Sequence, residues 1–214
     1  MSGDNGQGNG HAGAKATGPQ KPPTFLQSQL ESLDRPARMV GLFSARELPP
    51  PDVERLVDVC RKAMREEDPA ASLTLFPIGG GAGAPSSRQG FRLEVREGEK
   101  AEPHDCLLHV FAMDDATSPH RDLLKHLTQL DAEMGQATRD SVEPAKAFLI
   151  VSSGRLDEGP RVHAYQNLVA LFASALNALI VDPAAAMVTM DPGEWADAME
   201  MSLEVEGGMK LLRR

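Results

Sequence analysis

The chain has 214 residues, and 22 Lys or Arg residues against 31 Asp or Glu residues give it a formal net charge of -9 at pH 7. The charged fraction of 25% and the hydrophobic fraction of 41% are those of an ordinary globular protein, and the length suits one domain with appendages. An acidic chain without a dense cluster of Lys and Arg repels phosphate backbones, so we expect no nucleic-acid binding.

The first 35 residues differ in composition from the rest of the chain. Residues 1–23 are rich in Gly, Asn, Gln, Ala and Pro, and such a segment cannot bury enough apolar surface to offset its ordering entropy. We therefore expect residues 1–35 to form a disordered tail. Within the tail, residues 24–34 form a short amphipathic segment, which we expect either to dock on its own domain or to bind a protein partner. Its apolar residues, at roughly helical spacing, are Phe25, Leu26, Leu30 and Leu33.

Residues 36–205 carry alternating strand and helix patterns, which predict a single folded domain. A strand over 39–45 precedes a helix over about 51–65, in which apolar residues recur every three or four positions. Three strands follow, and in the second of them apolar and charged residues alternate, which predicts one exposed face. These strands cover residues 72–78, 91–97 and 106–113.

A second amphipathic helix is expected from residue 118 to about 138. Ser118 is a natural N-cap, and Pro119 suits the first helical position. After a polar turn, KAFLIVSS at 146–153 is a continuous apolar run typical of a buried strand.

The stretch LVALFASALNALIV at 168–181 is the most apolar in the chain. A membrane-spanning helix needs about twenty apolar residues, so we interpret the stretch as the end of a core helix over about 160–177 and a short extended segment at 178–182. The expected inward face of this region comprises Leu168, Leu171, Phe172, Ala175, Leu176 and Leu179.

A last helix is predicted to begin at Asp191, where Asp191 is the N-cap, Pro192 takes the first position and Glu194 completes a capping-box-like pair. Residues 206–214 are expected to be a flexible C-terminus. The order β-α-β-β-β-α-β-α-β-α then predicts an α+β fold: one layered domain, with a mostly antiparallel mixed sheet and helices packed largely on one face.

Cys60 and Cys106 lie in unlike contexts, and the N-terminus lacks the basic start and apolar stretch of a secretory signal. Two buried, reduced thiols in the cytoplasm are therefore the simpler expectation.

Two motifs that suggest cofactor or metal binding do not meet the requirements of such a site. The glycines of IGGGAGAPSS at 78–87 are followed by no Lys and by a strand, so we expect a hairpin connection and not a phosphate-binding loop. In HDCLLH, alternation along a strand places His104 and Cys106 on one face and His109 on the other. We therefore predict no cofactor and no metal site.

Acidic and histidine residues follow strand ends, where sites tend to lie. Asp114, Asp115, His120 and Asp157 are candidates for acid–base work or for holding a divalent cation. Turn formation and helix capping explain the same residues without chemistry.

Four segments carry a family resemblance. They are MVGLF, the PPDVERL that follows it, KAFLIVSS and HAYQNLVALFASALNALIVDP. Over residues 38 to about 200 the chain resembles a bacterial family with no assigned activity, domain of unknown function 4261. That family often has a His just before its central strand, where this chain has Lys146. The resemblance implies a fold and a bacterial, cytoplasmic setting, and it brings no catalytic residues.

Two hypotheses about function follow. The favoured one, because no assembled catalytic set stands out, is a non-enzymatic module that binds a protein partner or a second copy of the chain. The alternative is a small hydrolase or transferase with its site on the acidic and histidine-containing loops at strand ends. Neither hypothesis involves a membrane.

Overall fold

The computed structural model describes residues 38–78, 88–154, 156 and 159–212, with side chains up to residue 203. Four predictions fall on residues outside this part of the chain. They concern the tail over 1–35, its apolar residues Phe25, Leu26, Leu30 and Leu33, most of the glycine-rich stretch, and Asp157.

A seven-stranded sheet forms the centre of the domain, and every pair of neighbouring strands in it is antiparallel. The strand order is β2-β3-β4-β5-β1-β6-β7, so the first strand in sequence lies inside the sheet between β5 and β6. The strands are β1 Arg38–Ser44, β2 Ser72–Pro77, β3 Arg88–Arg96, β4 His104–Ala112, β5 Ala147–Ser153, β6 Leu179–Asp182 and β7 Met187–Thr189.

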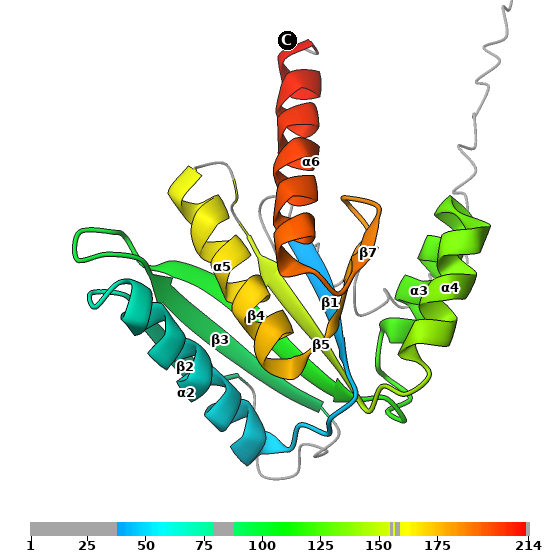
Figure 1. The fold of residues 1–214 in the computed structure, drawn as a ribbon, viewed down its shortest axis with the longest axis horizontal. Helices are drawn as coiled ribbons and strands as arrows, with labels where there is room; N and C mark the ends of the chain where they lie inside the picture. The colour runs from blue at the N-terminus through cyan, green and yellow to red at the C-terminus, as the bar shows by residue number, and fades with distance from the viewer. Residues whose placement is uncertain (1–37, 79–87, 155, 157–158, 213–214) are drawn as a thin grey trace, which may run out of the picture.

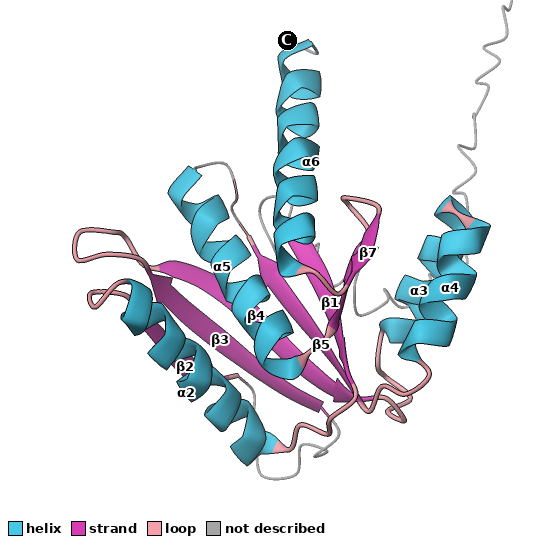
Figure 2. Ribbon diagram, in the orientation of Figure 1, coloured by secondary structure: helices cyan, strands magenta, loops and turns pink. Residues whose placement is uncertain are grey.

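Three of the five described helices cover one face of the sheet, and the other two form a hairpin on the opposite face (Figures 1 and 2). This arrangement confirms the predicted α+β domain with helices largely on one face. The helices are α2 Pro50–Glu67, α3 His120–Leu130, α4 Ala132–Val142, α5 Gly159–Leu176 and α6 Pro192–Leu212. Helices α2, α5 and α6 pack on the first face, and α3 and α4 form the hairpin.

The alternation of side chains along the central strands divides the core into two clusters. In β5, Leu149 and Val151 join the larger cluster under α2, α5 and α6, while Phe148 and Ile150 join the smaller cluster under α3 and α4. All seven residues of β5 are buried, as the apolar run at 146–153 predicts for a strand covered on both faces.

The single helix predicted over 118–138 is wrong, because the chain breaks at Asp131. This residue has extended backbone angles (φ -150°, ψ 118°), and its carboxylate accepts the N–H of Met134 at 2.9 Å, so it caps α4. A Cβ at Gly135 would lie 2.5 Å from the Cα of Thr128, so only glycine permits this approach of the two helices. The first helix also begins two residues later than predicted, since the Ser118 hydroxyl bonds to His120 and does not cap the helix.

Helix α5 contains residues 168–176 of the apolar stretch and lies in the larger core cluster, and β6 contains residues 179–181, in agreement with the predicted helix and extended segment. Leu168, Phe172 and Leu176 are buried, as expected. Leu171 and Ala175 are only partly buried, and the inward face turns instead toward residues such as Ala173, which is 2% exposed. Within the described part of the chain, no helix combines the length and the apolar character needed to cross a membrane.

The start of α6 follows the predicted cap with one difference. The Asp191 carboxylate accepts the N–H groups of Gly193 and Glu194, at 2.8 and 3.3 Å. The Glu194 carboxylate accepts the Thr189 hydroxyl at 2.6 Å, and the Thr189 oxygen accepts the N–H of Asp191 at 3.0 Å. Glu194 therefore reaches the N–H of Asp191 through the Thr189 hydroxyl, and not directly as the capping box requires. Helix α6 then continues to Leu212, through most of the stretch expected to be a flexible C-terminus.

A buried ion pair joins β1, β6 and α6 on the first face of the sheet. One carboxylate oxygen of Asp182 accepts from the Arg38 guanidinium and from the Trp195 indole, each at 3.0 Å. The other oxygen accepts the backbone N–H groups of Ala184 and Ala185, at 3.0 and 3.2 Å. Asp182 is fully buried and Arg38 is 6% exposed, so this network is the polar centre of the core.

We expect Ala173→Leu to lower the free energy of unfolding by roughly 1–3 kcal/mol, because the added carbons overpack a buried position. Ala175→Leu is the matched control, since Ala175 borders an open surface depression of about 340 Å³. This variant should lose much less free energy of unfolding. Denaturant unfolding of both variants measures the difference. Equal losses would contradict the observed orientation of α5.

We expect Asp182→Ala to cost about 3–5 kcal/mol of unfolding free energy, because the Arg38 guanidinium stays buried without its carboxylate. A double-mutant cycle with Arg38→Met should show that the double variant loses less than the sum of the two single losses. The exposed pair of Asp52 and Arg55 is the control, and Asp52→Ala should cost no more than about 1 kcal/mol. Additive losses at the buried pair would rule out the coupling.

Candidate functional site

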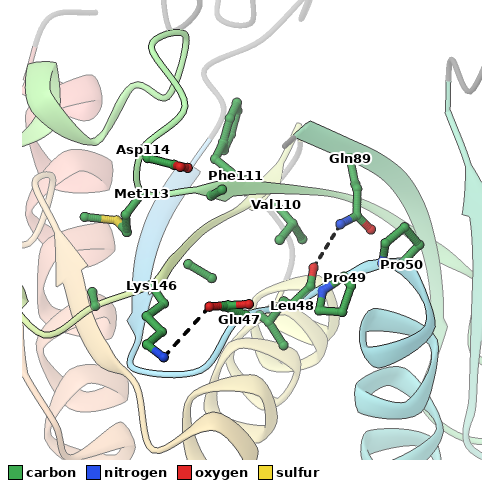
Figure 3. A pocket seen from close by; sticks show the side chains of 13 residues that line it. Glu47, Leu48, Pro49, Pro50, Gln89, Val110, Phe111, Met113, Asp114 and Lys146 are labelled. Atoms are coloured by element: carbon green, nitrogen blue, oxygen red, sulfur yellow. Dashed lines mark hydrogen bonds and ion pairs between the residues drawn. The ribbon is translucent and has the colours of Figure 1, made fainter. Parts of the chain in front are cut away.

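A concavity of about 630 Å³ lies where β1 and β4 end and β3 and β5 begin (Figure 3). We call it the strand-end cleft and define it by the residues that line it. They are Glu47, Leu48, Pro49, Pro50, Gln89, Val110, Phe111, Ala112, Met113, Asp114, Ala145, Lys146 and Ala147.

Backbone hydrogen bonds bring these segments together. The N–H of Lys146 donates to the carbonyl of Ser44 at 2.8 Å, and the carbonyl of Lys146 accepts from Met113 at 3.1 Å. Lys146 is thus held between the ends of β1 and β4, directly before β5. Because antiparallel neighbours start and finish at the same edge of a sheet, side chains from distant parts of the sequence meet here.

The lining of the cleft combines apolar residues with four polar ones, Glu47, Gln89, Asp114 and Lys146. Val110 and Phe111 are buried, and two adjacent prolines, Pro49 and Pro50, form a stiff border. The Lys146 ammonium lies 3.8 Å from the Glu47 carboxylate, as Figure 3 shows. Both of these side chains are more than half exposed, so their ion pair is weak.

Gln89 carries the clearest unused polar group of the cleft. Its Nε2 donates to the carbonyl of Leu48 at 2.9 Å, and this contact determines which way the amide is turned (Figure 3). Its Oε1 is buried and has no hydrogen-bond partner among the residues that the structure describes. A buried acceptor without a donor costs about 1–3 kcal/mol.

The structure places the predicted site residues in different surroundings. Asp114 lines the strand-end cleft. Asp115 turns its carboxylate to the N–H and the hydroxyl of Thr117, both at 2.7 Å, so it stabilises the turn before α3. Asp157 lies outside the described residues.

His120 has a packing role in the smaller core cluster. Its Nδ1 lies 2.7 Å from the Ser118 hydroxyl, and its ring meets Phe148 edge-on at a centroid distance of 6.1 Å. Burial, with a smaller contribution from Arg121, lowers the pKa of His120, so the imidazole is neutral at neutral pH. It does not line the strand-end cleft with Asp114.

A second group of interest is a serine–histidine pair that the sequence analysis did not identify. The Nε2 of His104 lies 2.8 Å from the Ser153 hydroxyl, and the two residues are 6% and 2% exposed. Burial, and then the charge of Arg161, lower the pKa of His104. His104 borders a cavity of about 340 Å³ that Arg92 also lines. Only the pairing register of β4 with β5 reveals this contact.

The remaining thiol and imidazole groups agree with the predicted face pattern. Cys106 lies in the larger core cluster, and His109, three residues further along β4, is on the opposite face beside Phe111. Burial, and then Arg88, lower the pKa of His109 to about 4. Both cysteines are buried and free, and burial raises the pKa of Cys60 to about 12. No three His, Cys, Asp or Glu side chains of the described residues are grouped to hold a metal ion.

Comparisons with family models, with curated proteins and with solved structures find no match for this chain. The resemblance to domain of unknown function 4261 therefore stays a prediction.

Proposed function

We propose that this protein is a non-enzymatic interaction module that binds a segment of a protein partner in the strand-end cleft. The observation that carries the proposal is the concavity of about 630 Å³ at the strand ends, where Gln89, with an Oε1 that has no hydrogen-bond partner among the described residues, lies beside charged and apolar side chains. Apolar walls supply the affinity of such a site, and a few separated polar groups orient the occupant. The strand-end cleft has both.

The charges around the cleft favour an occupant that donates hydrogen bonds. Two carboxylates, Glu47 and Asp114, line it together with one ammonium, Lys146. The whole chain carries a formal charge of -9, and a field of that sign speeds encounter with a basic partner. The proposed occupant is therefore a peptide segment with apolar residues and at least one basic or amide donor.

The proposal includes a cytoplasmic, bacterial setting. Two buried, free thiols support a reducing compartment, and the family resemblance implies the same setting. The partner is another protein or a second copy of this chain.

Affinity capture from the native host, with quantitative mass spectrometry, tests the proposal through matched variants. We expect Gln89→Leu and Lys146→Glu to lose a partner that the unaltered chain captures, because the first removes the orienting amide and the second reverses the charge beside Glu47. Lys125→Glu is the control, since this exposed residue of α3 does not line the cleft. Gln89→Leu also removes the hydrogen bond to the Leu48 carbonyl, so the melting temperature of each variant is measured to separate lost binding from lost folding. A partner retained equally by all variants would exclude the cleft as its site.

The second candidate function is a small hydrolase or transferase, and the pair of Ser153 with His104 favours it. A serine within 2.8 Å of an imidazole nitrogen meets the distance requirement for a nucleophile and its base. Against catalysis, Ser153 is 2% exposed, so a substrate carbonyl does not reach its hydroxyl in this conformation.

A fluorophosphonate probe distinguishes the two functions, because it labels only activated serine nucleophiles. We expect no labelling of Ser153 in the folded protein, since its hydroxyl is buried. Ser152→Ala is the control for Ser153→Ala, because the neighbouring side chain points to the other face of β5. Labelling that Ser153→Ala abolishes and Ser152→Ala retains would establish the enzyme and contradict the proposed non-enzymatic module.

A further inference from the structure

A second concavity, about 290 Å³ in volume, lies on the opposite face of the sheet between α3, β1 and β5. We call it the α3 groove, and its lining is mainly apolar. Its apolar lining residues include Met39, Gly41, Leu123, Phe148, Ile150 and Pro183. Its polar side chains are those of Asp122 and His126, both exposed on α3.

Close packing at Gly41 sets the position of α3 beside the groove. A Cβ on Gly41 would lie 2.8 Å from a ring carbon of Phe148 and 2.9 Å from a methyl of Leu123, so helix and sheet are in direct contact there. The α3–α4 hairpin and β7 diverge toward the top of the view in Figure 1. Among the described residues, this face carries only the hairpin, whereas the other face carries three helices, and the α3 groove opens beside the smaller cluster.

We propose that residues 24–34 of the same chain dock in the α3 groove. The described chain enters the domain at Arg38, and the next residue, Met39, already lines the groove. Leu33 precedes Met39 by six residues, a span of at most about 20 Å when fully extended. Leu30 and Leu33 are therefore tethered close to an apolar groove, at the high effective concentration that a short linker provides.

The composition of the N-terminal residues selects this segment as the occupant. Among residues 1–37, the large apolar side chains other than that of Met1 are confined to the segment. They are Phe25, Leu26, Leu30 and Leu33. Helical spacing puts Leu26, Leu30 and Leu33 on one side, which matches a groove walled by a helix on one side and a sheet on the other.

Docking of this segment has a consequence for α3. The segment would add an element to the face on which the described residues place the α3–α4 hairpin, and it would hold the start of α3 against β1. It would also keep its leucines away from any partner protein. The inference concerns a different surface from the strand-end cleft and does not rest on the proposed function.

The test uses the full-length chain with Leu30→Ser and Leu33→Ser together, which remove apolar groups without altering the described domain. The matched control is Gln27→Ser with Gln29→Ser, in the same segment. The first measurement is the methyl resonance of Met39, assigned with Met39→Leu, and the exposed methyl of Met201 serves as a reference. The second is hydrogen exchange of the α3 amides over residues 120–126.

We expect the leucine variant to shift the Met39 resonance and to speed exchange at the start of α3 by about tenfold, while the glutamine variant and Met201 stay unchanged. An unchanged Met39 resonance in the leucine variant would overturn the proposal, because the segment would not occupy the groove. The Met39 resonance of the unaltered chain could also move on dilution to the position seen in the leucine variant, while sedimentation shows a dimer. That result would show that the segment of a second copy occupies the groove, which also overturns same-chain docking.

Discussion

The carboxylate of Asp182 is the interaction on which the arrangement of the sheet and α6 depends. A buried charge is costly unless donors surround it, and here four N–H donors converge on one carboxylate from Arg38, Trp195, Ala184 and Ala185. These donors come from the first residue of β1, from α6 and from the turn between β6 and β7. A change of register in β1 or β6 would leave several of them unsatisfied at once, so the network specifies one register as well as contributing stability.

Both surfaces discussed above lie along β1, whose position that network determines. Met39, at its start, lines the α3 groove, and the carbonyl of Ser44, at its end, receives the N–H of Lys146 beside the strand-end cleft. Because β1 is an interior strand paired with β5 and β6, it cannot slide or fray independently of its neighbours. One wall of each concavity is therefore held by an interior strand, and a preformed wall reduces the ordering cost of binding.

Local periodicity predicted the elements whose burial repeats regularly, and it failed where contact depends on the fold. The apolar runs in β5 and α5 could be recognised by their length and composition, so these elements and the α+β class could be predicted, although the inward face of α5 was partly wrong. The break at Asp131 was missed because Leu127, Leu130 and Met134 keep helical spacing across it; the available signal was Asp131 itself, an N-cap residue, followed by Gly135. The strand-end cleft could not be predicted, since Gln89, Glu47 and Lys146 meet only through antiparallel register. No periodic pattern contains that information.

The buried histidines and the polar residues of the strand-end cleft differ in their surroundings, and this difference distinguishes packing roles from binding roles. Burial lowers the pKa of His104, His109 and His120, so each contributes stability above about pH 6.5. That contribution is lost as the pH falls toward the lowered pKa, because the unfolded chain then binds the protons that the folded one excludes. These imidazoles act as neutral, packed groups. Gln89, whose Oε1 has no hydrogen-bond partner among the described residues, lines the strand-end cleft. Groups already satisfied inside a core gain little from a partner, whereas the exposed Glu47 and Lys146 side chains of the strand-end cleft can contact an occupant directly.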